Sequence, residues 1–239
     1  MATFEELWRF LRGFPLFWLF MTLLGYRFGF WVNAKTKGSS WFNPIVVANV
    51  TLISFLVITG VDYATYFTGG QYIHLLLGPA TVALAVPLYA NLSRLTRAFG
   101  PLSLTLLIGS TVGIVAGVAL GASLGLERDI LLTLGPRSVT TPIAMGIAEQ
   151  TGGIPQLAAA FVILTGIIGC LVSIPLIQRL GWDSDLVLGF STGLAAHGIG
   201  TARVFQLSET AGAFAGLAMG LNGLLTAVLI PILLGLFPI

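Results

Sequence analysis

Charged side chains are scarce in this sequence. Asp, Glu, Lys and Arg make up 8% of its 239 residues, whereas about 25% is usual in a soluble domain. Eleven basic and nine acidic residues are too few to cover the outside of a soluble fold of this length. Hydrophobic residues make up 56% of the chain, and the mean hydropathy is +0.97. The composition therefore excludes a soluble globular protein and predicts that membrane lipid surrounds most of the surface.

Cysteine, lysine and histidine are almost absent. The single cysteine, Cys170, excludes a disulfide bond within the chain and a cysteine-based zinc site. The two lysines, Lys35 and Lys37, lie outside any Gly-rich loop, so no Walker A motif is present. The two histidines, His74 and His197, have no carboxylate cluster beside them, so neither a metal nor a cofactor is expected. The net charge of +2 is too small for a nucleic-acid-binding surface.

Long apolar runs make up most of what is present. A helix needs about 20 apolar residues to cross a bilayer, and the sequence contains eight runs of suitable character. The fifth and seventh are rich in Gly, Pro, Ser and Thr, so we expect broken helices there. The eight runs are Phe14–Val32, Pro44–Gly60, Ile73–Asn91, Leu102–Ser123, Ile130–Gln150, Ile154–Ile177, Leu186–Phe205 and Thr210–Leu236.

These runs define the predicted fold class. We expect an all-α integral membrane protein, a polytopic helical bundle of about eight spans of which two are broken. The stretch Phe4–Leu11 is amphipathic, so residues 1–13 are predicted to form an interfacial N-terminal segment. Residues 14–239 are predicted to form a single transmembrane domain.

Glycine recurs at every fourth residue in two of the runs. Such ladders flatten one side of a helix, so another backbone can approach it closely. We interpret them first as surfaces of tight packing within the bundle. A face for a homo-oligomer and a sliding surface between moving parts are the alternatives. The ladders are Gly109, Gly113, Gly117, Gly121 and Gly125, and then Gly212, Gly216 and Gly220.

The fifth run contains the first candidate site, residues 134–145. Pro136 and Pro142 remove backbone hydrogen bonds, and in lipid the freed carbonyls are tolerated only inside the protein or beside a cavity. Arg137 adds a permanent positive charge, which near the membrane interior indicates a functional site. The alternative is that its side chain reaches the interface at one end of the run. Hydroxyl groups come from Ser138, Thr140 and Thr141.

The seventh run contains the second candidate site, residues 191–203. Gly198 and Gly200 predict an unwound turn beside His197. A half-helix that begins there points its N–H groups at the break, which suits an anion. Arg203 can clamp a carboxylate with two parallel hydrogen bonds. The alternatives are an ion pair between this arginine and the acidic residue beyond it, and a histidine satisfied by a carbonyl.

A third polar position is Asn222, in the middle of the last run. A buried amide must be paired, so Asn222 either bonds a neighbouring helix or lines the same cavity as the two breaks. Together these positions form the predicted substrate-binding set, with no catalytic and no metal-binding residue. The set is Arg137, Ser138, Thr140, Thr141, His197, Gly198, Gly200, Thr201, Arg203 and Asn222.

The segment Gly189–Gly193 matches the G-x-S-x-G pattern of serine hydrolases. That pattern needs a strand–turn–helix in a soluble sheet, with the acidic residue and then the histidine following the serine. Here the histidine downstream of Ser191 is His197, on the same predicted run. We therefore expect no enzymatic activity, and the alternative is an intramembrane serine hydrolase in which His74 pairs with Ser191.

Five stretches of the sequence together resemble the LrgB/CidB family of bacterial membrane proteins. The resemblance covers most of the chain, from about residue 44 to the end. Each stretch alone is unspecific, and the combination is specific. The stretches are Leu76–Tyr89 (LLGPATVALAVPLY), Pro136–Met145 (PRSVTTPIAM), Gly152–Pro155 (GGIP), Ala196–Arg203 (AHGIGTAR) and Gly216–Gly223 (GLAMGLNG).

The resemblance implies a multi-pass protein of the bacterial inner membrane that works with a separate small holin-like protein of the LrgA/CidA type. The family is associated with control of murein hydrolase activity, autolysis and programmed cell death, as an antiholin-like or holin-like component. Its relatives include a plastid glycolate/glycerate translocator and bacterial systems for pyruvate uptake. A distant similarity to cation–proton antiporters and bile-acid symporters implies that two broken helices cross at the substrate site.

Two functional hypotheses follow from the residues and the resemblance. The first is secondary transport of a small carboxylate such as pyruvate, glycolate or glycerate. Arg137 or Arg203 would neutralise its charge, and Glu149 or His197 would couple a proton. The second is an antiholin-like modulator of murein hydrolases and autolysis, acting through helix–helix association with a holin-like partner.

Overall fold

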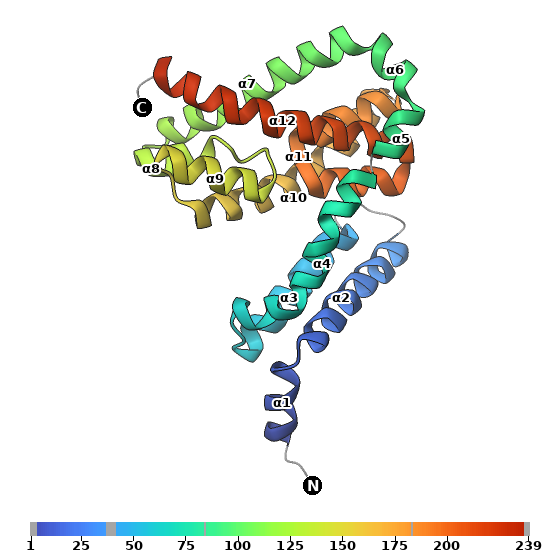
Figure 1. Cartoon of the computed structure of the whole chain (residues 1–239), viewed down its shortest axis with the longest axis vertical. Coiled ribbons are helices and arrows are strands. Elements are labelled where there is room, and N and C mark those ends of the chain that lie inside the picture. Colours follow the sequence, from blue (N-terminus) through green and yellow to red (C-terminus); the bar gives the residue numbers. More distant parts are fainter. Residues whose placement is uncertain (1–3, 37–41, 84, 183, 237–239) are drawn as a thin grey trace. The chain divides into compact units, whose positions relative to one another are not determined.

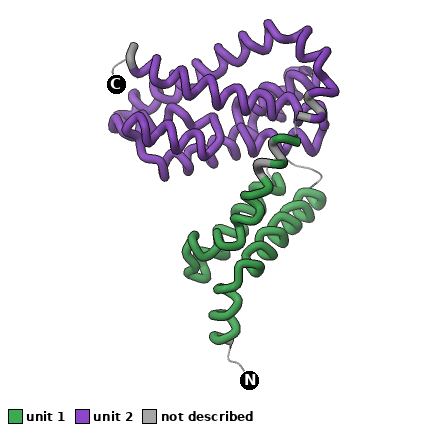
Figure 2. The backbone as a smooth tube through the Cα atoms, viewed as in Figure 1, with its two compact units in different colours: residues 1–83 green, residues 84–239 purple. Residues whose placement is uncertain are grey.

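The structure is a computed structural model that describes residues 4–36, 42–83, 85–182 and 184–236. Within these ranges every regular element is a helix, which confirms the predicted all-α class (Figure 1). Residues 1–3 of the predicted interfacial segment, Lys37, and Leu84 of the predicted third run lie outside the described residues. The chain divides into two compact units, residues 1–83 and 84–239 (Figure 2). The single domain expected over residues 14–239 stays a prediction.

The described residues of the first unit form four helices. Asn43 caps α3, because its side chain accepts a hydrogen bond from the N–H of Ile45 at 2.8 Å. Asp62 does the same for α4 by accepting from the N–H of Thr65 at 3.0 Å. Prolines begin α2 and α3, where the missing N–H costs no helical hydrogen bond. The helices are α1 (Phe4–Arg12), α2 (Pro15–Lys35), α3 (Pro44–Thr59) and α4 (Tyr63–Ala83).

Helix α2 is the centre of the first unit and packs against both α3 and α4. Its Trp18 is fully buried, and the indole N–H donates to the carbonyl of Arg12 at 2.8 Å. Gly29 of α2 lies against the backbone of α3, and Gly69 of α4 lies against the backbone of α2. A side chain at either glycine would meet main-chain atoms, so close backbone contact joins these three helices.

The described residues of the second unit form eight helices, and this unit contains both candidate sites. A core cluster of small and branched side chains joins α10, α11 and α12, with Ala196, Ala211 and Ala215 fully buried. The helices are α5 (Ala85–Ala90), α6 (Leu92–Arg97), α7 (Phe99–Ser123), α8 (Arg128–Leu134), α9 (Thr141–Thr151), α10 (Pro155–Arg179), α11 (Asp185–Leu207) and α12 (Glu209–Leu236).

Helices α11 and α12 touch through their backbones. Gly189 and Gly193 of α11 lie directly against the carbonyl groups of Ala211 and Ala215 on α12. A side chain at either glycine would overlap those carbonyls. The two glycines of the G-x-S-x-G pattern therefore lie one helical turn apart on a packing surface.

The glycine ladder of α7 faces the interior of the second unit. Gly109 lies against Leu194 of α11, and Gly121 lies against Leu131 of α8. The structure thus supports the tight-packing interpretation at these positions. Gly125 lies beyond the end of α7 and has a φ of +74°, so it serves the turn rather than the ladder.

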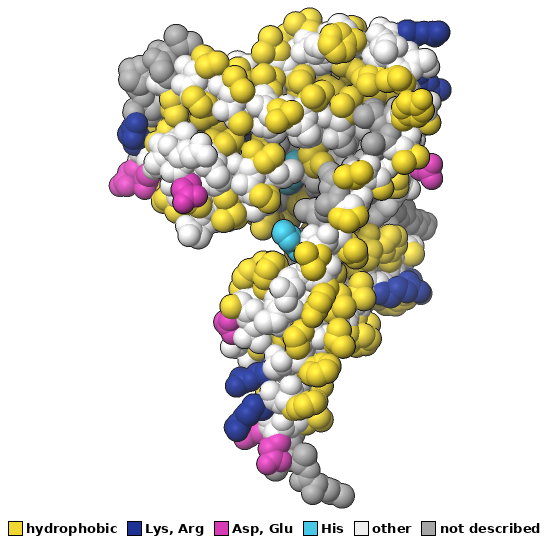
Figure 3. All heavy atoms as spheres, viewed as in Figure 1, with side chains coloured by type: hydrophobic (Ala, Val, Ile, Leu, Met, Phe, Trp, Pro, Cys, Tyr) yellow, Lys and Arg dark blue, Asp and Glu magenta, His cyan; other side chains and the backbone are white. Residues whose placement is uncertain are grey.

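Within the described ranges, four helices are long and apolar enough to cross a membrane, namely α2, α7, α10 and α12. On the face shown in Figure 3, hydrophobic side chains cover most of the surface and charged side chains lie toward the edges. This arrangement agrees with a multi-pass membrane protein. The count of about eight spans stays a prediction. The fifth and seventh predicted runs are not simple spans, and their breaks form the candidate site.

Candidate binding site

Helix α11 reverses its direction at His197. This residue has φ 38° and ψ −130°, and among the described residues it is the one non-glycine residue with a positive φ. Gly200 lies against Thr192, with a Cβ added at Gly200 only 2.8 Å from the Thr192 methyl group. In a continuous helix these two residues would be about 12 Å apart along the axis. The element therefore consists of two half-helices, residues 185–196 and 198–207, that fold back on each other.

The reversal corrects the prediction that residues 186–205 form a broken membrane span. The first half-helix is about 18 Å long at ~1.5 Å per residue, whereas the hydrocarbon core of a bilayer is about 30 Å thick. Leu188 near the start packs in one cluster with Val204 near the end. The run is thus a helical hairpin whose turn lies inside the unit, because Ala196 and His197 are buried.

The fifth run also folds back on itself. Residues 135–140 are not helical and separate α8 from α9, which have only seven and eleven residues. After α9 the chain returns to α8, where the N–H of Ile154 donates to Thr133 Oγ1 at 2.8 Å and Gly153 lies against Thr133. Both predicted breaks are therefore present, and each is the turn of a hairpin.

Hydroxyl groups gather at the turn of the first hairpin. Thr140 is the N-cap residue of α9, and its carbonyl accepts from the N–H of Ala144 at 2.9 Å while its side chain makes no capping bond. Ser138, Thr140 and Thr141 are all half-buried. In the described part of the chain, no hydrogen bond to protein is seen from these three hydroxyls. The amino end of α9 adds the positive end of a helix dipole.

Arg137 lies in the same turn and points toward α7. Its guanidinium lies directly against Gly117, and Nη1 donates to the carbonyl of Leu134 at 3.3 Å. A Cβ added at Gly113, one turn away on α7, would lie 3.9 Å from Ser138 Oγ. The ladder of α7 therefore leaves room for the polar side chains of the first hairpin.

Val162 on α10 is linked to the turns of both hairpins, to the first through a shared core cluster and to the second through its carbonyl. Its side chain packs with Val139 in one fully buried cluster. Its carbonyl lies 2.8 Å from Nε2 of His197. Gly166, one turn along α10, lies against the imidazole and leaves room for it. The two breaks therefore meet at α10, because the cluster of Val162 includes Val139 of the first turn and its carbonyl contacts His197 of the second.

Asn222 on α12 connects the two hairpins through its amide. Nδ2 donates to the carbonyl of Ser138 at 3.0 Å and to the carbonyl of Leu194, just before the turn of α11, at 3.4 Å. Oδ1 accepts from Ser110 Oγ at 2.7 Å and from Thr226 Oγ1 at 3.3 Å. The side chain is 1% exposed, and each of its donors and acceptors has a protein partner.

The other predicted site residues occupy different surroundings. Thr201 Oγ1 donates to the carbonyl of His197 at 2.7 Å and so stabilises the turn. Gly198 faces Met219 of α12. Arg203 lies on the returning half of α11, where Nη1 donates to Gln206 Oε1 at 3.2 Å. The structure brings Ser138, His197 and Asn222 to the meeting point of the hairpins, and it places Arg137 beside Ser138, against α7, and Arg203 on the second hairpin.

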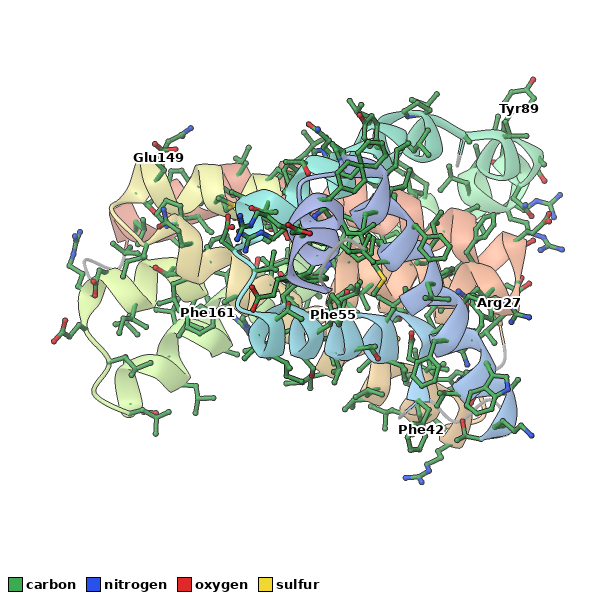
Figure 4. All side chains as sticks on the ribbon, turned by 90° about the horizontal axis from the view of Figure 1, so that it is seen from below. Arg27, Phe42, Phe55, Tyr89, Glu149 and Phe161 are labelled. Carbon is green, nitrogen blue, oxygen red and sulfur yellow. The ribbon has the colours of Figure 1, made fainter. Side chains whose placement is uncertain are left out.

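Glu149, one of the two predicted proton-coupling residues, lies near the end of α9. Its side chain is exposed and points away from the neighbouring helices (Figure 4). It is separated from the start of α9 by about 12 Å along the helix. His197 is therefore the better placed of the two beside the hairpin turns.

Sequence reasoning missed the residues that contact Asn222 and His197. Ser110 and Thr226 are hydroxyl residues in apolar runs, and Thr226 follows Asn222 by one helical turn, which is a usable signal. Gly166 resembles any other packing glycine. Val162 contacts His197 through its backbone carbonyl. Every residue type has this group, so the sequence gives no signal for the contact.

An apolar groove of about 220 Å³ opens beside the first hairpin. Its lining has no polar side chain, so it suits a hydrocarbon chain rather than a carboxylate. Among the described residues there is also no group of three His, Cys, Asp or Glu side chains that could hold a metal ion. The groove is lined by Ile114, Val115, Val118, Ala119, Leu131, Leu132, Gly135, Ile230, Leu233 and Leu234.

Comparison with known proteins gives a family match over most of the chain. The model of the LrgB-like family matches residues 22–236, which includes both hairpins. No solved structure matches the chain.

Several relatives match over most of their length. The Bacillus subtilis protein named "Uncharacterized protein YwbG" is 35% identical over 80% of this chain and 85% of the relative. "Holin-like protein CidB" of Staphylococcus epidermidis is 32% identical over 82% of this chain and 85% of the relative. "Holin-like protein CidB" of Staphylococcus aureus is 29% identical over 93% and 96% of the two chains.

Proposed function

The chain belongs to the LrgB-like family, and from this premise we propose that it is a secondary transporter for a small monocarboxylate such as pyruvate, glycolate or glycerate. It acts alone or as a transporter subunit with an LrgA-like membrane partner. The protein is a multi-pass bacterial membrane protein. The proposed activity moves the anion without a chemical reaction.

The observation that supports transport is the meeting of two hairpin turns inside an otherwise apolar unit. Non-helical backbone at membrane depth is tolerated only where protein or a water-filled cavity satisfies it. A protein that acts through helix association alone has no need of such turns. Transporters use interrupted helices of this kind to bind substrates and ions near the bilayer midplane.

The chemistry of the first hairpin suits a carboxylate. Three half-buried hydroxyls, from Ser138, Thr140 and Thr141, can donate hydrogen bonds at the amino end of α9. Arg137 adds a positive charge in the same turn. A guanidinium can hold a carboxylate with two parallel hydrogen bonds. We therefore assign charge neutralisation to Arg137 rather than to Arg203, which lies on the other hairpin beside Gln206.

The test is uptake of labelled pyruvate, glycolate and glycerate into proteoliposomes, with this chain alone and together with its holin-like partner. Arg137→Gln should reduce saturable uptake at least tenfold, and Arg203→Gln serves as the matched control that keeps most of the activity. Both variants must reach the membrane in equal amounts. Absence of uptake by the wild-type protein under any gradient, with the partner present and orientation verified, would overturn the proposal.

A second candidate function is suggested by the names of two relatives, which are called holin-like proteins. In this alternative the chain modulates murein hydrolase activity and autolysis through a holin-like partner. The Arg137→Gln variant separates the two functions in a cell-lysis assay. If autolysis responds to the variant as it does to the wild type although uptake is lost, modulation is independent of transport. Ser191→Ala should change neither activity, since its flanking glycines serve packing.

A further inference from the structure

The orientation of the Asn222 amide is fixed by its partners. Two of them are backbone carbonyls, of Ser138 and Leu194, and a carbonyl can only accept a hydrogen bond. The other two are hydroxyls, which can donate. The nitrogen must therefore face the carbonyls and the oxygen must face the hydroxyls, because a flipped amide would place acceptor against acceptor.

Both carbonyls come from places where helical hydrogen bonding is interrupted. Ser138 lies in the non-helical turn between α8 and α9. In a continuous helix the carbonyl of Leu194 would pair with the N–H of Gly198, and the reversal at His197 falls between these two residues. A buried carbonyl without a partner costs free energy, so each hairpin needs a donor at this point.

We infer that Asn222 is a positioning residue, which holds the two hairpin turns in register by donating one N–H to each, and that it does not bind the transported anion directly. The amide is 1% exposed and has no donor left over for a ligand. The hydroxyls of Ser110 and Thr226 hold its oxygen, so the side chain has one orientation. Only the expected effect of Asn222 substitutions on uptake rests on the proposed function.

The direct test measures the distance between the hairpins and needs no transport. Spin labels are placed at Gly146 on α9, where an added Cβ meets nothing within 4 Å, and at exposed Ala202 on the returning half of α11. Native Cys170 is buried, so it is left in place, with an unmutated chain as the labelling control. The distance distribution is recorded by pulsed electron resonance in lipid nanodiscs.

The variants isolate the two donated hydrogen bonds. Asn222→Leu keeps a similar volume and removes both donors, and it should at least double the width of the distance distribution. Thr226→Val is the matched control on the same helix, because it removes a bond to the amide oxygen and leaves both bridges intact. It should keep the wild-type distribution. If the leucine variant does not fold, Asn222→Ser replaces it, since one hydroxyl can serve at most one of the two carbonyls.

Uptake then shows whether positioning matters for transport. Asn222→Leu should raise the KM for the anion at least tenfold, and Thr226→Val should change it less than threefold. An unchanged distance distribution in Asn222→Leu would overturn the inference, and loss of uptake with that unchanged distribution would point to direct binding instead. If the wild-type protein transports no anion, the proposed function fails while the distance measurement still decides the role of Asn222.

Discussion

Replacing Gly166 with alanine is expected to dislodge His197 from its place on α10. A Cβ added at Gly166 would lie 2.5 Å from Cε1 and 2.8 Å from Nε2 of the imidazole, closer than real Cβ contacts. The ring has little freedom to move, since Nε2 is bonded to the carbonyl of Val162 at 2.8 Å and the residue forms the sharp turn of α11.

The expected cost has two parts. Overpacking of a well-filled interior costs about 1–3 kcal/mol, and leaving a buried hydrogen-bonding group unpaired costs about 1–3 kcal/mol. Gly166→Ala should therefore destabilise the protein by about 2–6 kcal/mol. For a chain of this length that corresponds to a fall in melting temperature of at least about 4 °C. Uptake should fall together with stability, because the second hairpin turn is displaced.

The assay is thermal unfolding of the purified protein in detergent or nanodiscs, followed by uptake in proteoliposomes. Gly146→Ala is the matched control, because a Cβ there meets nothing within 4 Å. It should be neutral or should stabilise the helix by up to about 1 kcal/mol, as glycine is a poor helix former. A Gly166→Ala protein with the melting temperature and uptake of the wild type would refute the reasoning about the imidazole.

Two further pairs of substitutions test the first hairpin. Gly117→Ala places a methyl group on the guanidinium of Arg137, so uptake should fall at least tenfold, as for Arg137→Gln. In the control Gly113→Ala the new methyl group lies 3.9 Å from Ser138 Oγ, an ordinary contact, so uptake should stay at the wild-type level. Equal effects of Gly117→Ala and Gly113→Ala on uptake would contradict the assignment of charge neutralisation to Arg137. Thr133→Val removes the acceptor for the N–H of Ile154 and should cost about 1–3 kcal/mol in thermal unfolding. Thr133→Ser should restore this stability, and a fully stable valine variant would show that the bond is dispensable.

The long helices could be predicted from the sequence because lipid exposure sets their length and composition. The run predicted at Leu102–Ser123 corresponds to α7, Phe99–Ser123, and the run at Ile154–Ile177 corresponds to α10, Pro155–Arg179. The predicted and observed ends differ by at most three residues, as is usual where prolines and short polar segments begin or end a helix.

The places of the two breaks could also be predicted, but their geometry could not. Glycine and proline show where backbone hydrogen bonds are interrupted, and they do not show which way the chain continues afterwards. At His197 the chain turns back, and the reversal depends on contacts of the returning half with α12, such as Gly212 against Phe205. Such contacts join residues whose pairing no local pattern specifies.

The partners of the polar residues were the least predictable part of the candidate site. The sequence left two roles open for Asn222, and its bonds to Ser138 and Leu194 reach residues 84 and 28 positions away. Arg203 looked equivalent to Arg137 in the sequence, because both lie beside a predicted break. Only the fold separates them, by placing Arg137 in the first hairpin turn against Gly117 of α7 and Arg203 on the second hairpin beside Gln206.

The contact between His197 and Val162 also fixes the tautomer of the imidazole. A carbonyl cannot donate, so the hydrogen on Nε2 points at Val162 and the neutral ring has its lone pair on Nδ1. A proton taken up at Nδ1 would therefore place a positive charge at the turn of α11 without breaking the bond that anchors the ring to α10. The bond to Val162 is therefore compatible with both the neutral and the protonated ring.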